Sequence, residues 1–233
     1  MYNFSMKMRL NKFLALSGIA SRRKCDLLIE QGRIFVNKKQ VSELGEKIDP
    51  DLDIVEFDGK KVNLKKSVYI LLNKPEGFLC SCAKRNLSEK TILDLIDVKE
   101  RIFPVGRLDK NSSGLIILTN DGELALKLTH PSFEKEKEYE VLVNKKITLE
   151  FLQSMERGVV IENDYKTRKT KLKKISDKSF SIILKEGKKR QIRQMCQALG
   201  YFVVKLKRTR IGKLKLANLK VGEWKKISRE DIV

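Results

Sequence analysis

The sequence predicts an α+β fold in two parts, a small N-terminal domain of two helices on a small sheet and a larger domain with a mixed or antiparallel central sheet flanked by helices. Apolar or alternating runs typical of strands occur at 68–75, 115–118, 138–143 and 179–184. Segments with helical spacing fall at 123–129 and 189–199. This mixture of element types favours an α+β domain with a central sheet.

Length and charge limit the function classes. The chain has 233 residues, 41% of them hydrophobic, which is enough for a real core. Its net charge of +20 favours a phosphate-rich partner such as RNA or DNA over an anionic membrane surface. No apolar run approaches the ~20 residues that span a bilayer, and residues 1–10 lack the apolar middle of a signal peptide. We therefore expect a cytoplasmic protein with no membrane partner.

Metal and histidine chemistry are poorly supported. The four cysteines and the single histidine, His130, do not form paired ligand motifs. We expect reduced thiols, no metal and no cofactor. A lone histidine next to Pro131 also argues against His-based triads, so any catalysis would depend on Asp, Tyr, Lys or Arg.

The N-terminal segment predicts two helices followed by a strand and turn at 33–41. Leu10, Phe13 and Leu14 share one helical face, and Ser17-Gly18 ends that helix. Ser21 is a candidate N-cap for a second helix that ends at Gly32, with Leu27 and Leu28 facing inward. We assign residues 7–64 to this domain, and residues 68–233 to the second domain after a linker at 62–66.

Basic residues cluster in the first domain. Residues 7–40 contain nine basic residues and two acids, whereas residues 41–59 contain seven acids and one base. A solvated helical surface would explain any single charge, but the clustering favours an RNA-binding face. The candidate RNA-binding residues are Arg9, Lys12, Arg22, Arg23, Lys24 and Arg33.

A glycine-bounded polar loop precedes the strand at 115–118. It carries Asp109 two residues after Arg107. Alone, Asp109 reads as a turn or cap aspartate, and Arg107 as a phosphate binder or ion-pair partner. A carboxylate on a stiff support beside an arginine is also a potential nucleophile or base.

The helix at 189–199 has an apolar stripe and a polar stripe that includes Arg190 and Arg193. Residues 185–215 hold eleven bases and one acid, a bias typical of a groove that follows phosphates. Tyr139 is either a core residue or a ring that stacks on a nucleobase. Leu206, which alternates with Phe202 and Val204, is more simply a core residue.

These pieces together resemble a known family. Gly106-Arg107-Leu108-Asp109, Ser113-Gly114-Leu115, Leu118–Gly122, Lys137-Glu138-Tyr139 and Arg190–Met195 are similar, in this order, to motifs of the pseudouridine synthases that modify bacterial ribosomal RNA. Residues 9–41 resemble the alpha-L RNA-binding domain that precedes the catalytic domain in many of these enzymes. Gly222-Glu223-Trp224 resembles their C-terminal strand. The resemblance covers roughly residues 8–230.

The resemblance implies roles for seven residues. Asp109 would match the catalytic aspartate needed to break the uridine N1–C1′ bond, Tyr139 would stack on the extruded uracil, and Arg193 would pair with Asp109. Whether Asp109 attacks directly or acts through a glycal-like species stays open. Arg107 would fill the gap left by the extruded nucleotide or hold its phosphate, and Leu206 would wall the pocket. The substrate-binding set is Arg107, Leu206, Arg190 and Lys189.

Two positions depart from the family pattern, which often has Asn where this chain has Lys189 and a second Arg where it has Gln194. We expect uridine-to-pseudouridine isomerisation by base flipping in ribosomal RNA, of the large subunit or an assembly intermediate, by a monomer. The alternative is a non-catalytic RNA-binding factor in ribosome assembly.

Overall fold

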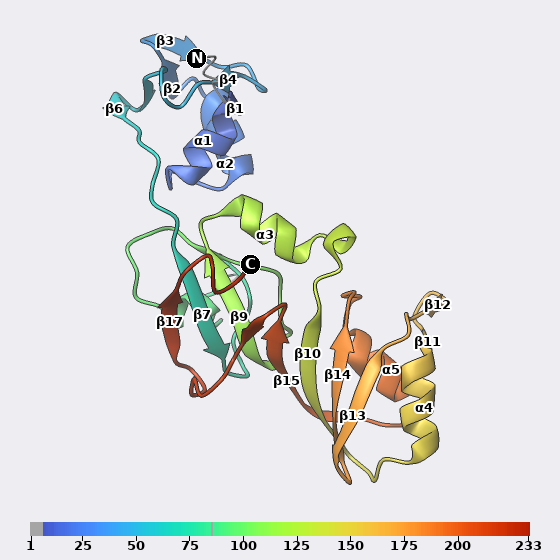
Figure 1. Cartoon of the computed structure of the whole chain (residues 1–233). Coiled ribbons are helices and arrows are strands. Elements are labelled where there is room, and N and C mark those ends of the chain that lie inside the picture. Colours follow the sequence, from blue (N-terminus) through green and yellow to red (C-terminus); the bar gives the residue numbers. More distant parts are fainter. Residues whose placement is uncertain (1–6, 85) are drawn as a thin grey trace. The chain divides into compact units, whose positions relative to one another are not determined.

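The computed structural model describes residues 7–84 and 86–233, which form two compact units (Figure 1). The first unit contains the chain up to Val68, together with Lys99–Arg101 and Asn120–Gly122. The second contains Tyr69–Val98, Ile102–Thr119 and Glu123–Val233. Across the described residues, no helix combines the length and apolar character that crossing a bilayer requires.

The first unit has two helices and two small antiparallel sheets. Strand β1 pairs with β4, and the other strands follow the order β3-β2-β5-β6. The elements are β1 (Met8–Arg9), α1 (Leu10–Leu16), α2 (Arg22–Glu30), β2 (Ile34–Val36), β3 (Lys39–Val41), β4 (Lys47–Ile48), β5 (Val55–Phe57) and β6 (Lys60–Lys61). The expected pair of helices on a small sheet is confirmed.

Helix α2 begins and ends as its sequence predicts. The Ser21 hydroxyl accepts a hydrogen bond from the Lys24 amide at 3.3 Å, and Gly32 follows the helix with a φ of +67°. Leu28 is buried as expected, but the inward placement of Leu27 is wrong, since that residue is 55% exposed. The buried face is Cys25, Leu28 and Ile29, which keeps the three- and four-residue spacing of a helix.

The second unit contains one large sheet, three α-helices and several short elements among its described residues. Its sheet strands are β7 (Tyr69–Lys74), β8 (Phe103–Pro104), β9 (Ser113–Thr119), β10 (Lys137–Val143), β13 (Lys171–Ser176), β14 (Ser179–Leu184), β15 (Val203–Ile211), β16 (Leu214–Lys215) and β17 (Trp224–Ile227). The other elements are η1 (Ile92–Leu95), α3 (Gly122–Thr129), η2 (Pro131–Phe133), α4 (Leu149–Arg157), β11 (Val160–Ile161), β12 (Tyr165–Lys166) and α5 (Gln191–Ala198).

The large sheet is mixed. Its main order is β13-β14-β10-β15-β9-β7-β17, with β16 on β15 and β8 on β9. Strands β15 and β9 run parallel, and the other neighbours are antiparallel. The expected mixed central sheet is confirmed. The basic run at 166–174 contributes only its second half to β13, the edge strand.

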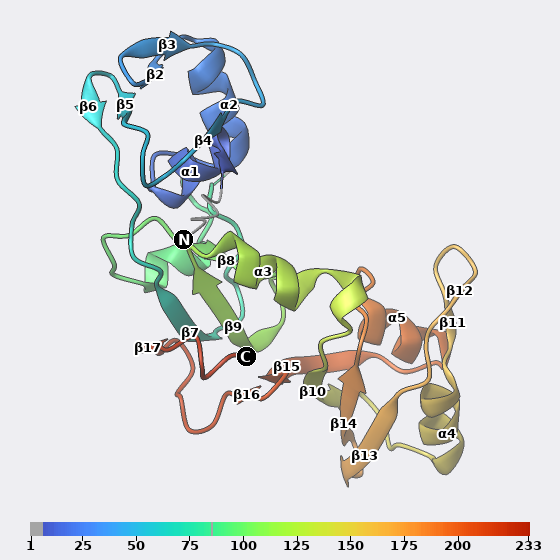
Figure 2. The same cartoon turned by 45° about the horizontal axis from the view of Figure 1, so that its top comes forward.

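Helices cover the sheet in two places. Helices α4 and α5 lie near the β10–β14 end, where Phe151, Met155 and Met195 join the buried core (Figures 1 and 2). Helix α3 packs Leu124 and Leu128 against β7 and β9 in a second cluster. The part of the sheet between these clusters supports the site described next.

The grouping of Leu206 with Phe202 and Val204 is wrong. Leu206 is buried, whereas Phe202 and Val204 are 64% and 54% exposed. The register of β15 against β10 shifts between Leu142 and Val143, so the simple alternation of faces is interrupted there.

Candidate active site

A pocket of about 910 Å³ opens in the second unit, between the 105–109 loop, the strands β10 and β15, and the segment 185–192. Six of the seven residues expected from the sequence line it: Arg107, Asp109, Tyr139, Lys189, Arg190 and Leu206. The seventh, Arg193, is not among the lining residues. The topology thus brings together residues separated by about 100 positions of sequence.

Two cations hold the backbone of the loop that carries Asp109. The Lys74 ammonium, at the end of β7, is fully buried and donates to the carbonyl oxygens of Asp109 (3.2 Å), Lys110 (3.3 Å) and Ser112 (2.7 Å). The Arg193 guanidinium donates to the remaining carbonyl in this stretch, that of Asn111, at 2.6 Å. Every carbonyl from 109 to 112 therefore faces a positive side chain.

Lys74 is stable there because its hydrogen bonds are numerous. A fourth carbonyl, that of Pro75, lies 3.0 Å from the ammonium, so its three N–H groups are shared among four acceptors. Burial is the main cause that lowers the pKa of Lys74, while the charges of Glu76 and Asp109 oppose that shift. Bonds to a charged donor contribute about 1.5–3 kcal/mol each, so three fully engaged N–H groups offset the several kcal/mol that burying an ammonium costs.

Arg193 lies behind the loop. Besides Asn111, it donates to the Val203 carbonyl at 3.0 Å and approaches the Ser112 hydroxyl at 3.5 Å. Burial, reinforced by Arg190, lowers the pKa of Arg193, and Asp109 partly opposes this. The expected ion pair with Asp109 is not formed within 4.0 Å; Arg193 anchors the backbone of the same loop.

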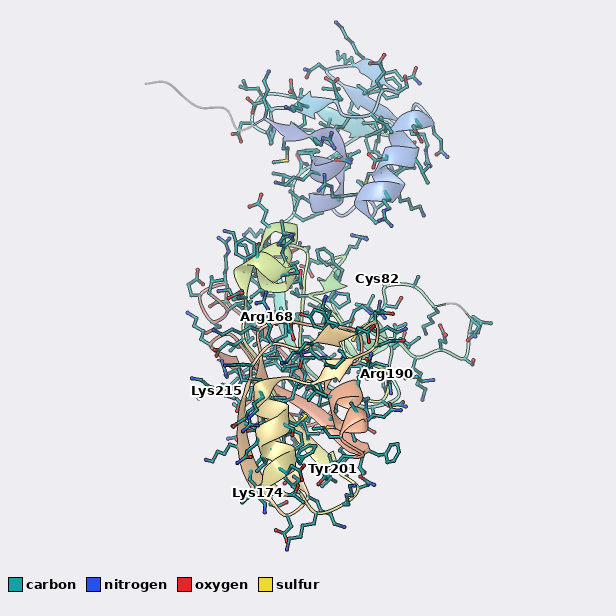
Figure 3. The ribbon with its side chains drawn as sticks, turned by 90° about the vertical axis from the view of Figure 1, so that its right-hand side faces the viewer. Cys82, Arg168, Lys174, Arg190, Tyr201 and Lys215 are labelled. Carbon is teal, nitrogen blue, oxygen red and sulfur yellow. The ribbon has the colours of Figure 1, made fainter. Side chains whose placement is uncertain are left out.

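Arg190 takes the place expected of Arg193. Its Nη1 lies 3.8 Å from Oδ2 of Asp109. Arg190 is the N-cap of α5 and has a left-handed backbone, with φ of 53° and ψ of 30°. Such a conformation is uncommon outside glycine and is often found at functional sites. In Figure 3, Arg168 and Arg190 lie near the middle of the second unit, and Tyr201 and Lys174 lie below them.

Tyr139 and Leu206 come from neighbouring strands. Leu206 pairs in register with Val141, and Tyr139 pairs with Arg208. Tyr139 is half-buried and packs against the core beneath the pocket, so the core and stacking interpretations of this residue are compatible. Asp109 is 37% exposed at its side chain, so it is open to a ligand.

A glycine permits the strand contact beside Asp109. Gly114, in β9, pairs with Arg208 of β15 and has a φ of +104°. A Cβ at this position would lie 2.2 Å from the Arg208 carbonyl oxygen. Any other residue at position 114 would push β9 and β15 apart.

Glu186 organises the opposite wall of the pocket. Its carboxylate accepts hydrogen bonds from the Tyr165 hydroxyl at 2.7 Å, the Arg168 amide at 3.1 Å and the buried Gln191 side chain at 2.5 Å. Lys188 lies over the Tyr165 ring, 4.2 Å from its centroid. Glu186 thus holds Tyr165, Arg168 and Gln191 in place at this wall.

Sequence reasoning missed Lys74, Glu186 and Arg208. The signal for Lys74 was a lysine that, with Asn73, ends a strand whose other residues are apolar or aromatic, and for Glu186 a single acid among eleven bases. Gln194, which departs from the family pattern, bonds the backbone and side chain of Glu162 at the β11–β12 hairpin.

In the first unit, the candidate RNA-binding residues lie mostly at the surface. Arg9, Arg22, Arg23 and Lys24 are exposed, and Lys12 is half-buried. Arg33 is also exposed, but Asp58 pairs with it and its guanidinium lies 4.8 Å from the centroid of the Phe57 ring. Asp58 therefore already neutralises one of the six cations.

Comparison with known proteins decides the family. Residues 68–198 match the family model of the RNA pseudouridylate synthases, and residues 8–54 match that of the S4 domain. The chain belongs to the RNA pseudouridylate synthase family. Its expected enzyme class, an isomerase that converts uridine to pseudouridine in RNA, follows from this membership.

Several relatives match over nearly the whole chain. An uncharacterised RNA pseudouridine synthase from Aquifex aeolicus is 41% identical, covering 97% of this chain and 93% of the relative. The dual-specificity RNA pseudouridine synthase RluF of Escherichia coli is 41% identical, covering 97% of this chain and 77% of the relative. The ribosomal large subunit pseudouridine synthase B of Bacillus subtilis is 41% identical, covering 96% of this chain and 93% of the relative.

A solved structure supports the fold. A crystal structure of a pseudouridylate synthase, 28% identical in sequence, superposes with a TM-score of 0.69 and covers 96% of this chain and 97% of that one. The N-terminal RNA-binding domain and the mixed-sheet second domain expected from the sequence therefore agree with the family.

Proposed function

We propose that this protein isomerises specific uridines of ribosomal RNA, in the large subunit, to pseudouridine. The observation that carries the proposal is the pocket that gathers Asp109, Tyr139 and Arg190, with Arg193 anchoring the Asp109 loop. One relative, named as a pseudouridine synthase of the ribosomal large subunit, matches almost the full chain and supports the choice of substrate. Such a substrate places the protein in the cytoplasm, and we propose that it acts as a monomer.

The chemistry assigned to Asp109 is cleavage of the N1–C1′ bond. The carboxylate takes up C1′ directly or assists formation of a glycal, and the base rotates and rejoins C1′ through C5. A uridine within a stack cannot reach Asp109, so the nucleotide must be extruded first. Tyr139 stacks on the extruded uracil, and Leu206 forms the wall next to it.

The positive residues divide the remaining work. Arg107, Lys189 and Arg190 are exposed at the pocket and hold the RNA backbone around the extruded nucleotide. Arg190 also keeps the Asp109 side chain oriented, and Arg193 acts on the same loop from behind.

We assign the two parts of the chain to binding and chemistry. Residues 7–64 form the RNA-binding domain, whose basic residues supply affinity and placement, and residues 68–233 form the catalytic domain. The alternative of a non-catalytic ribosome-assembly factor gains no support from the relatives, which are named as synthases.

The proposal is tested by mapping pseudouridines in ribosomal RNA from a strain that lacks this gene. We expect at least one large-subunit pseudouridine to be missing, to return with the wild-type gene, and to stay missing with Asp109→Asn. Asp164→Asn, an exposed change outside the pocket, is the matched control and should restore the modification. An unchanged set of pseudouridines in the deletion strain would contradict the proposed substrate.

A further inference from the structure

Arg208 is a buried cation whose hydrogen bonding is incomplete. It is 3% exposed, and its Nε donates to the Leu115 carbonyl at 2.8 Å. Its Nη2 is buried with no hydrogen-bond partner among the described residues. No carboxylate of the described chain forms an ion pair with it within 4.0 Å. A buried charge with neither an ion-pair partner nor a full set of hydrogen bonds is unfavourable unless a ligand supplies them.

Arg210, two residues further along β15, is an arginine whose charge is balanced by carboxylates. Its Nε lies 2.8 Å from the Glu138 carboxylate, and its Nη2 lies 3.2 Å from that of Glu136. Arg210 does not line the pocket, whereas Arg208 does. The arginine without a protein anion is therefore the one that faces the ligand space.

The register places Arg208 beside Tyr139. The two residues are direct partners across β15 and β10, and Lys137 precedes Tyr139 by two positions on the same face of β10. Lys137 also lines the pocket. Burial, with a further contribution from the charge of Arg208, lowers the pKa of Lys137. Two cations thus flank the ring on which the uracil is proposed to stack.

The carboxylates that line the pocket are already engaged elsewhere. Asp109 has Arg190 at 3.8 Å, and Glu186 is bonded to Tyr165 and Gln191. An anion for Arg208 and Lys137 must therefore come from the substrate. The exposed cations Arg107, Lys189 and Arg190 suit a phosphate. The buried Arg208 and the half-buried Lys137, beside an aromatic ring, suit a flat anion stacked on that ring.

We propose that Arg208 and Lys137 form an anion site that stabilises the uracil as it leaves C1′, an inference that rests on the proposed function. When the N1–C1′ bond breaks, its electron pair stays with the base, which becomes a uracil anion with charge spread over N1 and the carbonyl oxygens O2 and O4. On the direct route, C5 bonds to C1′ with an electron pair of this anion while the bond between C1′ and the Asp109 carboxylate breaks. The C5 proton is then lost to a base and N1 takes up a proton. The pair of cations lowers the barrier by stabilising charge that develops only during the reaction.

The test compares two leaving groups. Fluorine at C5 withdraws electrons and makes the base anion more stable, so cleavage of 5-fluorouridine needs less help from a cation. RNA substrates containing uridine or 5-fluorouridine at the target position are incubated with excess enzyme, and the rate of N1–C1′ cleavage is followed after nuclease digestion. We expect Arg208→Met to slow N1–C1′ cleavage of uridine about 100-fold, as for the loss of other donors to a developing anion. The factor by which it slows cleavage of 5-fluorouridine should be at least ten times smaller.

Control variants distinguish stabilisation of the base anion from a contribution to the folded structure. Arg210→Met removes a compensated arginine from the same strand and should slow both substrates by the same factor. Lys137→Met should show the substrate-dependent defect in weaker form, with RNA affinity within about twofold of wild type. Arg208→Lys retains the charge with fewer hydrogen-bond donors, so it keeps the test valid if Arg208→Met does not fold. It should also slow uridine more than 5-fluorouridine, but by a smaller margin than Arg208→Met.

Equal slowing of the two substrates in folded Arg208→Lys and Lys137→Met would overturn the proposal, because a structural role affects both alike. A defect confined to RNA affinity that disappears at high RNA concentration would also overturn it and would assign the site to a phosphate. If the wild-type protein leaves uridine unchanged, the proposed function fails, and this outcome is distinct from the others.

Discussion

The two units of this protein carry positive charge in opposite ways. In the first unit, Arg22, Arg23 and Lys24 extend from α2 into solvent. In the second, Lys74 and Arg208 are almost completely buried. Exposed cations attract a polyanion at long range and are screened by salt, whereas buried cations act over short distances on defined atoms. We therefore expect exposed cations to supply affinity for RNA and buried cations to organise the chemistry.

Mutations of exposed cations should therefore have different effects from mutations of buried cations. Loss of an exposed cation should weaken RNA binding and its salt dependence while leaving the chemical step intact. Loss of a buried cation should slow the chemical step at saturating RNA. The predictions below test this separation, starting with the largest expected effect.

Lys74→Met should have the largest effect after removal of Asp109 itself. Without the ammonium, the carbonyls of Asp109, Lys110 and Ser112 lose a shared donor, and the loop can shift. A displacement of about 1 Å costs roughly 100-fold in rate, so we expect the single-turnover rate to fall by about that factor. RNA affinity, measured by filter binding, should stay within about threefold of wild type.

Lys110→Met is the matched control for this variant, since Lys110 is exposed and only its backbone carbonyl contacts Lys74. Its single-turnover rate should remain within about twofold of wild type. An equal loss of rate in both variants would show that charge near the loop matters, and that anchoring of its backbone does not.

The triple variant Arg22→Gln, Arg23→Gln, Lys24→Gln should have an intermediate effect. If each side chain contacts one phosphate, the slope of log affinity against log salt should fall by about 2 for single-stranded RNA. The single-turnover rate at saturating RNA should not change. A slope identical to that of wild type would exclude α2 from the RNA-binding surface.

Arg33→Gln provides the comparison within this unit, because Asp58 already pairs with Arg33. We expect it to change the salt slope less than any one of the three α2 substitutions. A larger change would mean that RNA displaces Asp58 from Arg33.

The smallest expected effect is on the pH dependence of stability. Because burial lowers the pKa of Lys74, the unfolded chain holds this proton more tightly than the folded protein does. Between the two pKa values the unfolded state binds more protons, so the contribution of Lys74 to the free energy of unfolding rises with pH. The difference in that free energy between wild type and Lys74→Met should therefore increase from pH 7.5 to pH 9.5.

Chemical denaturation of both proteins at the two pH values provides the measurement. Other lysines contribute equally to both proteins, so they cancel in the difference. A difference that falls with pH would contradict the burial of a charged Lys74.

Much of the fold could be predicted from local patterns. Strand β14 and the helices α2 and α3 follow from alternation, spacing and capping residues, which act within a few residues of sequence. The patterns failed where tertiary contacts decide. Leu27 is exposed although it is apolar, and the bulge near Val143 alters which residues of β15 face the core.

The site was only partly predictable for the same reason. Motif order identified Asp109, Tyr139 and Arg193, but it could not show that Arg190 would be the arginine beside Asp109. That choice depends on the left-handed backbone at the start of α5. The roles of Lys74 and Arg208 depend on contacts across 35 and 93 positions of sequence, which no local pattern records.

The most direct test of the account is the release of tritium from C5-labelled uridine in RNA by Asp109→Asn, at saturating RNA and with binding measured in the same samples. We expect Asp109→Asn to bind RNA with wild-type affinity and to release no tritium above background, while Asp164→Asn releases tritium at the wild-type rate. Release by Asp109→Asn within tenfold of wild type would contradict the central role of this carboxylate.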